Sequence, residues 1–284
     1  MRSIAKLMKD WQFTGPDGVT AAVALPHTWN AVDGQDGGND YWRGTCTYRT
    51  SFAAPAFDPA QQQVWLQFEG VNSSATVLLN GQQLCTHDGG YSTFRAEVTE
   101  LLQAENQLTV QVDNSVNDRV YPQKADFTFY GGIYRDVSLL VVNKNHIALG
   151  HFGDTGVKIT PALKEGSADI QVETLVEGEG TVVVELLDAE GNSVARSEGA
   201  KASLHLDAPH LWNGVKDPYL YTCVVRLMQD GKPVDEVTTK VGLRSFSVDA
   251  KKGFFLNGKP YPLHGVSRHQ DRKGLGNAIT REMH

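Results

Sequence analysis

A two-residue alternation of apolar and polar side chains is the feature that most constrains how this chain folds. It runs through residues 64–68, 75–79 and 108–112, where every second residue is apolar. This period places the apolar side chains of a segment on one face of an extended strand. The dipeptide Asn80-Gly81 directly follows the second segment and predicts a tight hairpin turn. Because only residues 98–103 fit a helical turn, we predict a β-sandwich here.

A second block of short strands follows from about residue 143. Residues 168–176 alternate with the same period, and the segments 182–187, 221–227 and 234–241 also read as strands. About seven short strands within roughly a hundred residues are typical of an immunoglobulin-like sandwich. The turn spacings of the two blocks do not match, so we interpret them as two different folds and not as repeats.

The last forty or so residues show a different pattern. A hairpin is predicted around Asn257-Gly258, followed by a buried strand at residues 263–266. Residues 277–284 read as the opening turns of a helix, with Asn277 or Thr280 as its cap. A strand that leads through polar residues into a helix is how a parallel α/β unit begins.

Composition excludes several function classes. The chain has 284 residues, which suggests two or three domains, and its net charge of −7 gives no basic face for nucleic acid. No apolar run approaches the roughly 18 residues that a membrane-spanning helix needs. The three cysteines are odd in number and widely spaced, which favours free thiols in a reducing compartment. We therefore expect a cytoplasmic protein without a nucleic-acid or membrane partner.

Five short strings, in a fixed order along the chain, carry more specific information. They are Pro26-His27-Thr28-Trp29-Asn30 with Tyr41-Trp42-Arg43-Gly44; Phe68-Glu69-Gly70-Val71 with His87-Asp88-Gly89-Gly90-Tyr91; Tyr130-Gly131-Gly132-Ile133-Tyr134-Arg135-Asp136-Val137; Pro209-His210-Leu211-Trp212 with Pro218-Tyr219-Leu220-Tyr221; and Gly265-Val266-Ser267-Arg268-His269-Gln270-Asp271. Each string alone is weak. Together, their order and spacing resemble family 2 glycoside hydrolases, and the β-galactosidase branch in particular.

The resemblance implies a mostly β chain with three parts. These are a jelly-roll sugar-binding domain in residues 1–142, an immunoglobulin-like β-sandwich in residues 143–244, and the first βα unit of an incomplete (α/β)8 barrel in residues 245–284. The family uses two glutamates, an acid/base and a nucleophile, and hydrolyses its substrate with retention. It places both on later barrel strands, so we expect no catalytic residue in this chain and no activity from the chain alone.

The resemblance also implies a substrate. We expect the parent protein to hydrolyse terminal β-D-galactosides, toward which the Arg268-His269-Gln270-Asp271 string leans. A β-glucuronidase or β-mannosidase is the alternative within the family, and a stand-alone carbohydrate-binding or assembly module is the alternative from another class. A homo-oligomeric parent protein is compatible with the resemblance.

Several residues match positions that hold the sugar in this family. The histidine of the last string is the strongest candidate, because an imidazole can donate to or accept from a hydroxyl. The expected substrate-binding residues are His269, Asp126, Asn39, Asp40, Arg268 and Asp271. The resemblance places a monovalent cation near Asp126 and a divalent metal in the barrel, with no cofactor in this chain. Against these roles, Arg268 and Asp271 could pair with each other, and Asp126 could only cap a loop.

Overall fold

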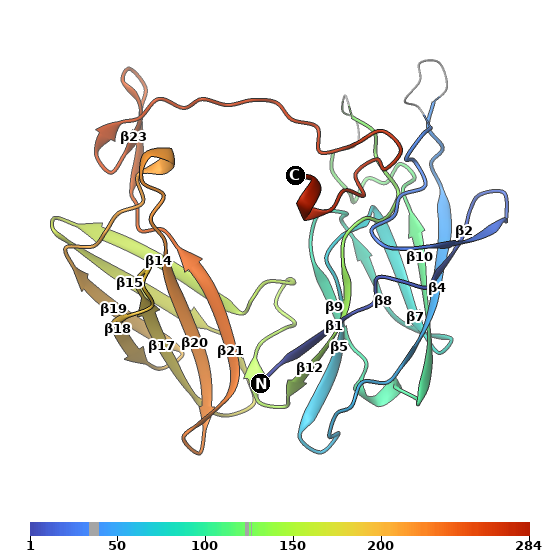
Figure 1. Cartoon of the computed structure of the whole chain (residues 1–284), viewed down its shortest axis with the longest axis horizontal. Coiled ribbons are helices and arrows are strands. Elements are labelled where there is room, and N and C mark those ends of the chain that lie inside the picture. The colour runs from blue at the N-terminus through green and yellow to red at the C-terminus, as the bar shows by residue number, and fades with distance from the viewer. Residues whose placement is uncertain (34–39, 123–124, 126) are drawn as a thin grey trace. The chain divides into compact units, whose positions relative to one another are not determined.

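A computed structural model describes residues 1–33, 40–122, 125 and 127–284 (Figure 1). The chain forms two compact units. The first unit contains Ser3–Val141 together with Arg268–His284, and the second contains Met1–Arg2 together with Val142–Ser267. The described residues form strands and three 3-10 turns, and none of them is in an α-helix. No helix in this part of the chain has the length and apolar character that a bilayer-spanning helix needs.

Two sheets and one short ladder make up the first unit. A six-stranded sheet has the order β3-β2-β4-β10-β7-β8, a four-stranded sheet has the order β1-β12-β5-β9, and β11 pairs with β6. The bounds are β1 Ser3–Lys6, β2 Trp11–Thr14, β3 Thr20–Val23, β4 Thr45–Ala53, β5 Gln62–Phe68, β6 Val71–Asn72, β7 Ser74–Leu79, β8 Gln82–Asp88, β9 Phe94–Glu97, β10 Glu105–Asp113, β11 Gly132–Ile133 and β12 Val137–Asn143, with a 3-10 turn at Thr99–Leu101.

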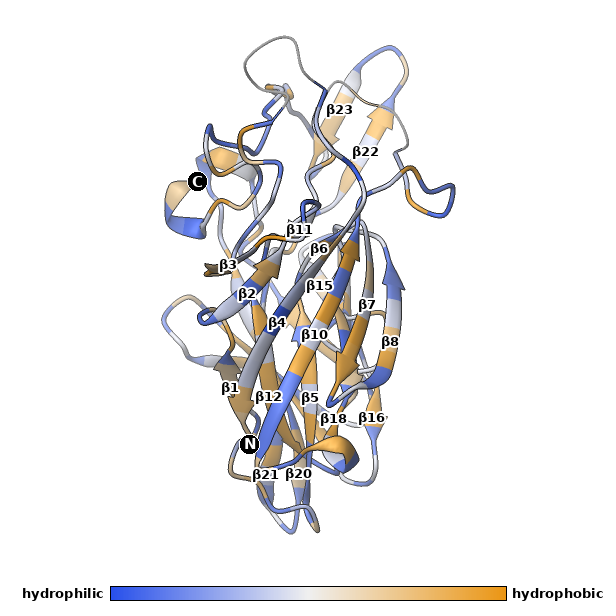
Figure 2. Ribbon diagram, turned by 90° about the vertical axis from the view of Figure 1, so that its right-hand side faces the viewer, coloured by the Kyte–Doolittle hydropathy of each residue, from blue (hydrophilic) through white to orange (hydrophobic). Residues whose placement is uncertain are grey.

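Period-two burial builds the core of this unit. Along β10 the even-numbered residues from Asn106 to Val112 are buried, and Figure 2 shows the resulting bands of hydropathy on that strand. The apolar side chains from both sheets join one cluster that contains Tyr48, Leu66 and Val110. At the predicted hairpin, Asn80 and Gly81 have φ of 52° and 82°, as a two-residue turn requires. The alternation and the turn are therefore confirmed.

The second unit contains an immunoglobulin-like sandwich of three and four strands. The sheets have the orders β14-β15-β19 and β18-β17-β20-β21, and β13 pairs with β16. The bounds are β13 His146–Ile147, β14 Val157–Lys164, β15 Ser167–Thr174, β16 Val176–Glu177, β17 Thr181–Leu187, β18 Ser193–Glu198, β19 Lys201–Asp207, β20 Tyr221–Gln229 and β21 Lys232–Val241, with a 3-10 turn at Gly214–Lys216. Ile170, Val184 and Leu204 are fully or almost fully buried in its core.

A buried ion pair attaches the N-terminus to this second unit. Arg2 Nε lies 2.7 Å from Asp235 Oδ1, and Arg2 Nη2 lies 2.5 Å from Asp235 Oδ2. The same carboxylate accepts the backbone N–H of Ile147 at 2.8 Å, and the Asp235 side chain is 1% exposed. The three cysteines are free, and Cys46 and Cys223 are buried, as predicted.

The last residues differ from the sequence prediction. A three-stranded sheet β22-β23-β24 (Phe246–Asp249, Gly253–Leu256, Lys259–Pro260) contains the predicted hairpin. The strand predicted at 263–266 does not form, and Leu263 and Val266 are 70% and 92% exposed. A strand needs neighbours for its backbone groups, and none of the strands in the described residues pairs with that segment. The predicted helix is reduced to a 3-10 turn at Arg281–Met283, so the βα unit is not confirmed.

Candidate functional site

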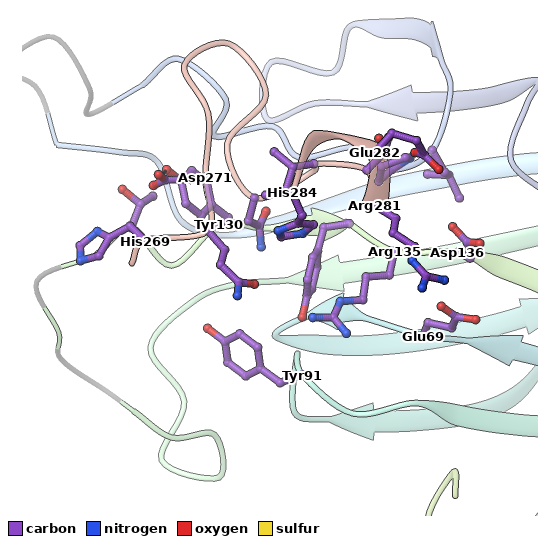
Figure 3. Close-up of a pocket in the computed structure, with 18 of the residues that line it drawn as sticks. Glu69, Tyr91, Tyr130, Arg135, Asp136, His269, Asp271, Arg281, Glu282 and His284 are labelled. Carbon is purple, nitrogen blue, oxygen red and sulfur yellow. Dashed lines mark hydrogen bonds between the residues drawn. The ribbon is translucent and has the colours of Figure 1, made fainter. Parts of the chain in front are cut away.

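The first unit contains a pocket of about 1080 Å³, which is at the upper end of the size of small-molecule sites. Its lining comes from the end of β1 and the residues after it, from the residues that follow β3 and β5, from Tyr91 before β9, from the chain on both sides of β11, and from the C-terminal segment 268–284. The C-terminal segment contributes Arg268, His269, Gln270, Asp271, Asn277, Ile279, Thr280, Arg281, Glu282 and His284. Figure 3 shows this lining.

Gly131 and Gly132 allow the string that begins at Tyr130 to pack closely against the string that begins at Pro26. A Cβ on Gly131 would lie 2.0 Å from the Trp29 ring, and one on Gly132 would lie 2.3 Å from the carbonyl oxygen of His27. Gly132 also has a φ of +144°, a backbone conformation that residues other than glycine rarely adopt. The close approach allows backbone hydrogen bonds from His27 N to Ile133 O and from Trp29 N to Gly131 O. We call these paired segments the wall, because Pro26 and Tyr130, which belong to the same two strings, line the pocket.

Two buried asparagines connect the loops behind this wall. The side-chain oxygen Oδ1 of Asn30 accepts from Gly131 N at 2.8 Å and from Asn114 Nδ2 at 3.1 Å. Asn114 in turn accepts from Gly44 N and donates to the carbonyl of Phe129. Both side chains are 0% exposed, and buried amides are stable only when they are hydrogen-bonded. Sequence reasoning assigned them no role, since neither contributes to the strand periodicity.

The C-terminal segment is held against this wall by specific contacts. The Tyr130 hydroxyl donates to Asp271 Oδ2 at 2.8 Å, and Gly274 N donates to the carbonyl of Ala31 at 3.2 Å. A Cβ on Gly276 would lie 2.7 Å from the Tyr130 ring, so only glycine allows this approach. These contacts place the string from Arg268 to Asp271 at the rim of the pocket.

The predicted site residues have different outcomes. His269, Arg268 and Asp271 line the pocket, and the His269 ring lies 6.3 Å from the Phe127 ring in an edge contact. Arg268 and Asp271 do not pair with each other, because Arg268 Nη2 contacts His284 Nδ1 at 3.1 Å and Asp271 contacts Tyr130.

Three predicted residues are not part of the described pocket wall. Asp40 is exposed, accepts the N–H of Tyr41 at 2.9 Å and does not line the pocket. Asn39 and Asp126 lie outside the described residues. The cation near Asp126 therefore stays a prediction. In the described ranges, no group of three or more His, Cys, Asp or Glu side chains could hold a metal ion.

Charged and aromatic side chains line the rest of the pocket. Lys6 Nζ lies 2.6 Å from Asp136 Oδ2, and this hydrogen bond raises the pKa of Lys6 above its ordinary value. Burial raises the pKa of the Tyr134 hydroxyl to about 12, so it stays protonated and donates to the carbonyl of Gly90. The Glu282 carboxyl has a lowered pKa, first through its own backbone N–H and then through the Thr280 side chain.

Comparison with known proteins identifies relatives of both units. A family model for the glycosyl hydrolase 2 galactose-binding domain-like fold matches residues 39–162, and a model for glycosyl hydrolases family 2 matches residues 151–244. A β-glucuronidase of Bacteroides fragilis is 36% identical over 98% of this chain and 43% of its own length. A β-galactosidase of Bacteroides ovatus is 33% identical over 95% of this chain and 35% of its own length.

Solved structures resemble the whole chain as well. The crystal structure of an FMN-binding β-glucuronidase from Faecalibacterium prausnitzii L2-6 has a TM-score of 0.95 and 38% identity, and the match covers 100% of this chain and 46% of that one. This chain thus spans less than half the length of these relatives.

Proposed function

This chain belongs to glycosyl hydrolase family 2, and we propose that it forms one wall of the sugar-binding pocket of a retaining exo-β-glycosidase. The observation that carries the proposal is the docking of the Arg268–Asp271 string beside Tyr130 in the pocket lining, through the hydrogen bond from the Tyr130 hydroxyl to Asp271. Strings that lie far apart in the sequence converge on one pocket, and they are the strings by which the chain resembles the family.

In this proposal His269 binds hydroxyls of the terminal sugar, since its ring can either donate or accept. Asp271 is held by the Tyr130 hydroxyl and keeps the segment on the wall. The two catalytic glutamates, one acid/base and one nucleophile about 5 Å apart, belong to the part of the parent protein that this chain does not include.

The proposed substrate is a terminal β-glucuronide. The relatives at 36% and 34% identity are named β-glucuronidase and putative β-glucuronidase. A terminal β-galactoside is the second candidate, supported by the Bacteroides ovatus relative and by a putative β-galactosidase structure from Bacteroides fragilis at 38% identity. This order reverses the preference that the sequence strings gave.

The test compares aryl β-glucuronide with aryl β-galactoside on the parent protein. We expect kcat/KM for the glucuronide to exceed that for the galactoside by at least about 100-fold, a selectivity that pairing of a buried charged group can supply. We expect His269→Ala to lower kcat/KM by at least about tenfold at unchanged Tm. Activity on neither glycoside would reject the proposal. A preference for the galactoside would reject only the choice of sugar.

A carbohydrate-binding module is a second candidate function. It is favoured by the galactose-binding domain-like family model and by the fact that the whole pocket is formed within the first unit of this chain. The purified chain is assayed for turnover of both aryl glycosides and for binding of galactose. Saturable binding without turnover supports a module, and turnover that survives repurification would contradict the expectation that this chain has no catalytic residue.

A further inference from the structure

A small hollow adjoins the pocket beside Tyr91. Tyr91 and Pro122 line both the pocket and the hollow, so the two meet at these residues. The hollow has a volume of about 10 Å³, which is about the space of one water molecule. The pocket, at about 1080 Å³, has the volume of sites that hold molecules larger than one sugar ring. A ligand whose terminal sugar lies at His269 therefore has room to extend as far as the hollow.

Tyr91 follows a closely packed turn that holds it at this boundary. The Tyr134 hydroxyl donates to the carbonyl of Gly90, and a Cβ on Gly90 would lie 2.0 Å from Asn72 Oδ1, so only glycine allows this packing. The Tyr91 side chain is 54% exposed, and its hydroxyl makes no hydrogen bond to any described residue. Figure 3 shows this hydroxyl directed toward the other side chains of the lining. A group that is already positioned loses less conformational entropy on binding than a free one.

Arg43 also lines the hollow and is held in place by two contacts. Its Nε donates to the carbonyl of Asn114 at 2.7 Å, and its guanidinium carbon lies 4.9 Å from the centre of the Phe129 ring. The Asp113 carboxylate attracts its charge, but the two terminal nitrogens make no hydrogen bond within the described part of the chain. A guanidinium group presents its donors in a fixed plane. Arg43 therefore has positioned donors for a ligand at the hollow.

A series of ring contacts connects the hollow to His269. The His269 ring lies 6.3 Å from the Phe127 ring, and the Phe127 ring lies 5.3 Å from the Phe129 ring. Phe129 is the ring under the Arg43 guanidinium. Only two aromatic rings therefore separate His269 from Arg43, which places the hollow within reach of a second ring of the same ligand.

The side chains around the hollow indicate which kind of ring this is. Tyr91 and Phe129 offer aromatic surface, and the Tyr91 hydroxyl and the Arg43 guanidinium offer hydrogen bonds. A sugar ring has an apolar face that packs on aromatic rings and hydroxyls that donate and accept hydrogen bonds. A flat aromatic group would use only the ring surface, and an inorganic anion would use only the guanidinium. A sugar residue uses both features.

We propose that Tyr91 and Arg43 form a second subsite, which binds a sugar residue on the leaving-group side of the glycosidic bond. The substrate of the parent protein is then an oligosaccharide, in which the terminal sugar lies at His269 and the next sugar lies against Tyr91. The inference rests on the proposed function. It concerns the part of the substrate that neither choice of terminal sugar specifies.

The experiment is calorimetric titration of the 284-residue chain with two pairs of ligands. One pair is lactose and methyl β-D-galactoside, and the other is glucuronic acid β-linked to N-acetylglucosamine and methyl β-D-glucuronide. Within each pair only the second ring differs. In the pair whose terminal sugar the pocket accepts, we expect the disaccharide to bind at least about tenfold more tightly than the methyl glycoside.

Two substitutions test the residues of the second subsite. Tyr91→Ala and Arg43→Gln should each lower the ratio of the two affinities to about threefold or less. Tyr91→Phe keeps the ring and loses the hydroxyl, so its ratio should lie between those of wild type and Tyr91→Ala. Melting curves of each variant establish that it is folded.

Arg244→Gln is the matched control for Arg43→Gln. The Arg244 guanidinium carbon also lies over an aromatic ring, at 5.0 Å from the centre of Trp212, and its Nη1 donates to the carbonyl of Gly242, but it belongs to the second unit. This variant removes the same charge and the same kind of ring contact, and it should leave the ratio unchanged.

Four results would overturn the second subsite. They are the absence of saturable binding of either disaccharide, a methyl glycoside that binds as tightly as its disaccharide, a phenyl glycoside that binds as tightly as the disaccharide, and a Tyr91→Ala chain that keeps the full ratio. Turnover of aryl glycosides by the parent is measured separately. A parent that hydrolyses neither glycoside would reject the proposed hydrolysis, while the ratio of affinities still reports on sugar binding at Tyr91.

Discussion

Removing the Arg2 side chain tests how the N-terminus stabilises the second unit. Arg2→Ala deletes both charge-assisted bonds to Asp235, at 2.7 and 2.5 Å, and leaves a carboxylate that is 1% exposed and that still accepts the Ile147 N–H. Breaking one side of a buried pair costs about 3–5 kcal/mol. Because the Arg2 side chain is 18% exposed, water can partly replace it. We therefore expect a loss of about 3 kcal/mol, at the lower end of that range.

The assay is scanning calorimetry of the chain, combined with fluorescence of Trp212, which is the one tryptophan of the five that lies in the second unit. For a unit of this size the expected loss corresponds to a Tm lower by about 10 °C. Arg2→Lys keeps the charge but loses the two-point geometry, so it should fall between wild type and Arg2→Ala. Lys6→Ala removes one partner of an exposed pair and should change Tm little. An Arg2→Ala chain that melts within about a degree of wild type would refute the assignment of stability to this ion pair.

Three further predictions concern pH, backbone space and thiols. Burial lowers the pKa of His27 to about 4 from 6.5, so between these two pH values only the unfolded chain binds the proton. The free energy of unfolding is therefore highest above pH 6.5 and should fall by up to about 3 kcal/mol as the pH drops to 4. Urea titrations measure this fall, and a His27→Gln chain should show a flatter dependence of stability on pH. Gly132→Ala should lower the free energy of unfolding by about 2–4 kcal/mol. The control Gly81→Ala should lower it by about 1 kcal/mol, since Gly81 has a positive φ but nothing within 4 Å of an added Cβ. Equal losses would show that the close approach of Gly132 to His27 is unimportant. Burial raises the pKa of Cys46 to about 12 and of Cys223 to about 11, so both should react with a disulfide reagent only on unfolding, and rapid reaction of either in the native chain would contradict this burial.

Most of the fold could be predicted because its strands bury one face. Residues 108–112 and the Asn80-Gly81 turn each carry their own local pattern, and both form as expected. The segment 263–266 shows where this reasoning fails. Its apolar run predicts a buried strand, but burial depends on neighbours that no local pattern supplies, and Val266 is 92% exposed.

The candidate site was less predictable than the fold. Resemblance identified His269 and Asp271, and both line the pocket. The Tyr130–Asp271 bond joins residues 141 positions apart. Long-range partners of this kind cannot be inferred from spacing along the chain.

The two buried asparagines have a consequence for how this protein can diversify. The Asn114 side chain donates to the carbonyl of Phe129, so these two residues are held together although they lie 15 positions apart. Lengthening a chain segment between two fixed points costs little entropy, so insertions and deletions between these residues should be tolerated while the wall stays in place. Substitution of Asn30 or Asn114 should remove this tolerance, because each satisfies the other. Among relatives, variation in length should therefore be concentrated between these two anchors, where it can alter what the pocket accepts without rebuilding the sandwich.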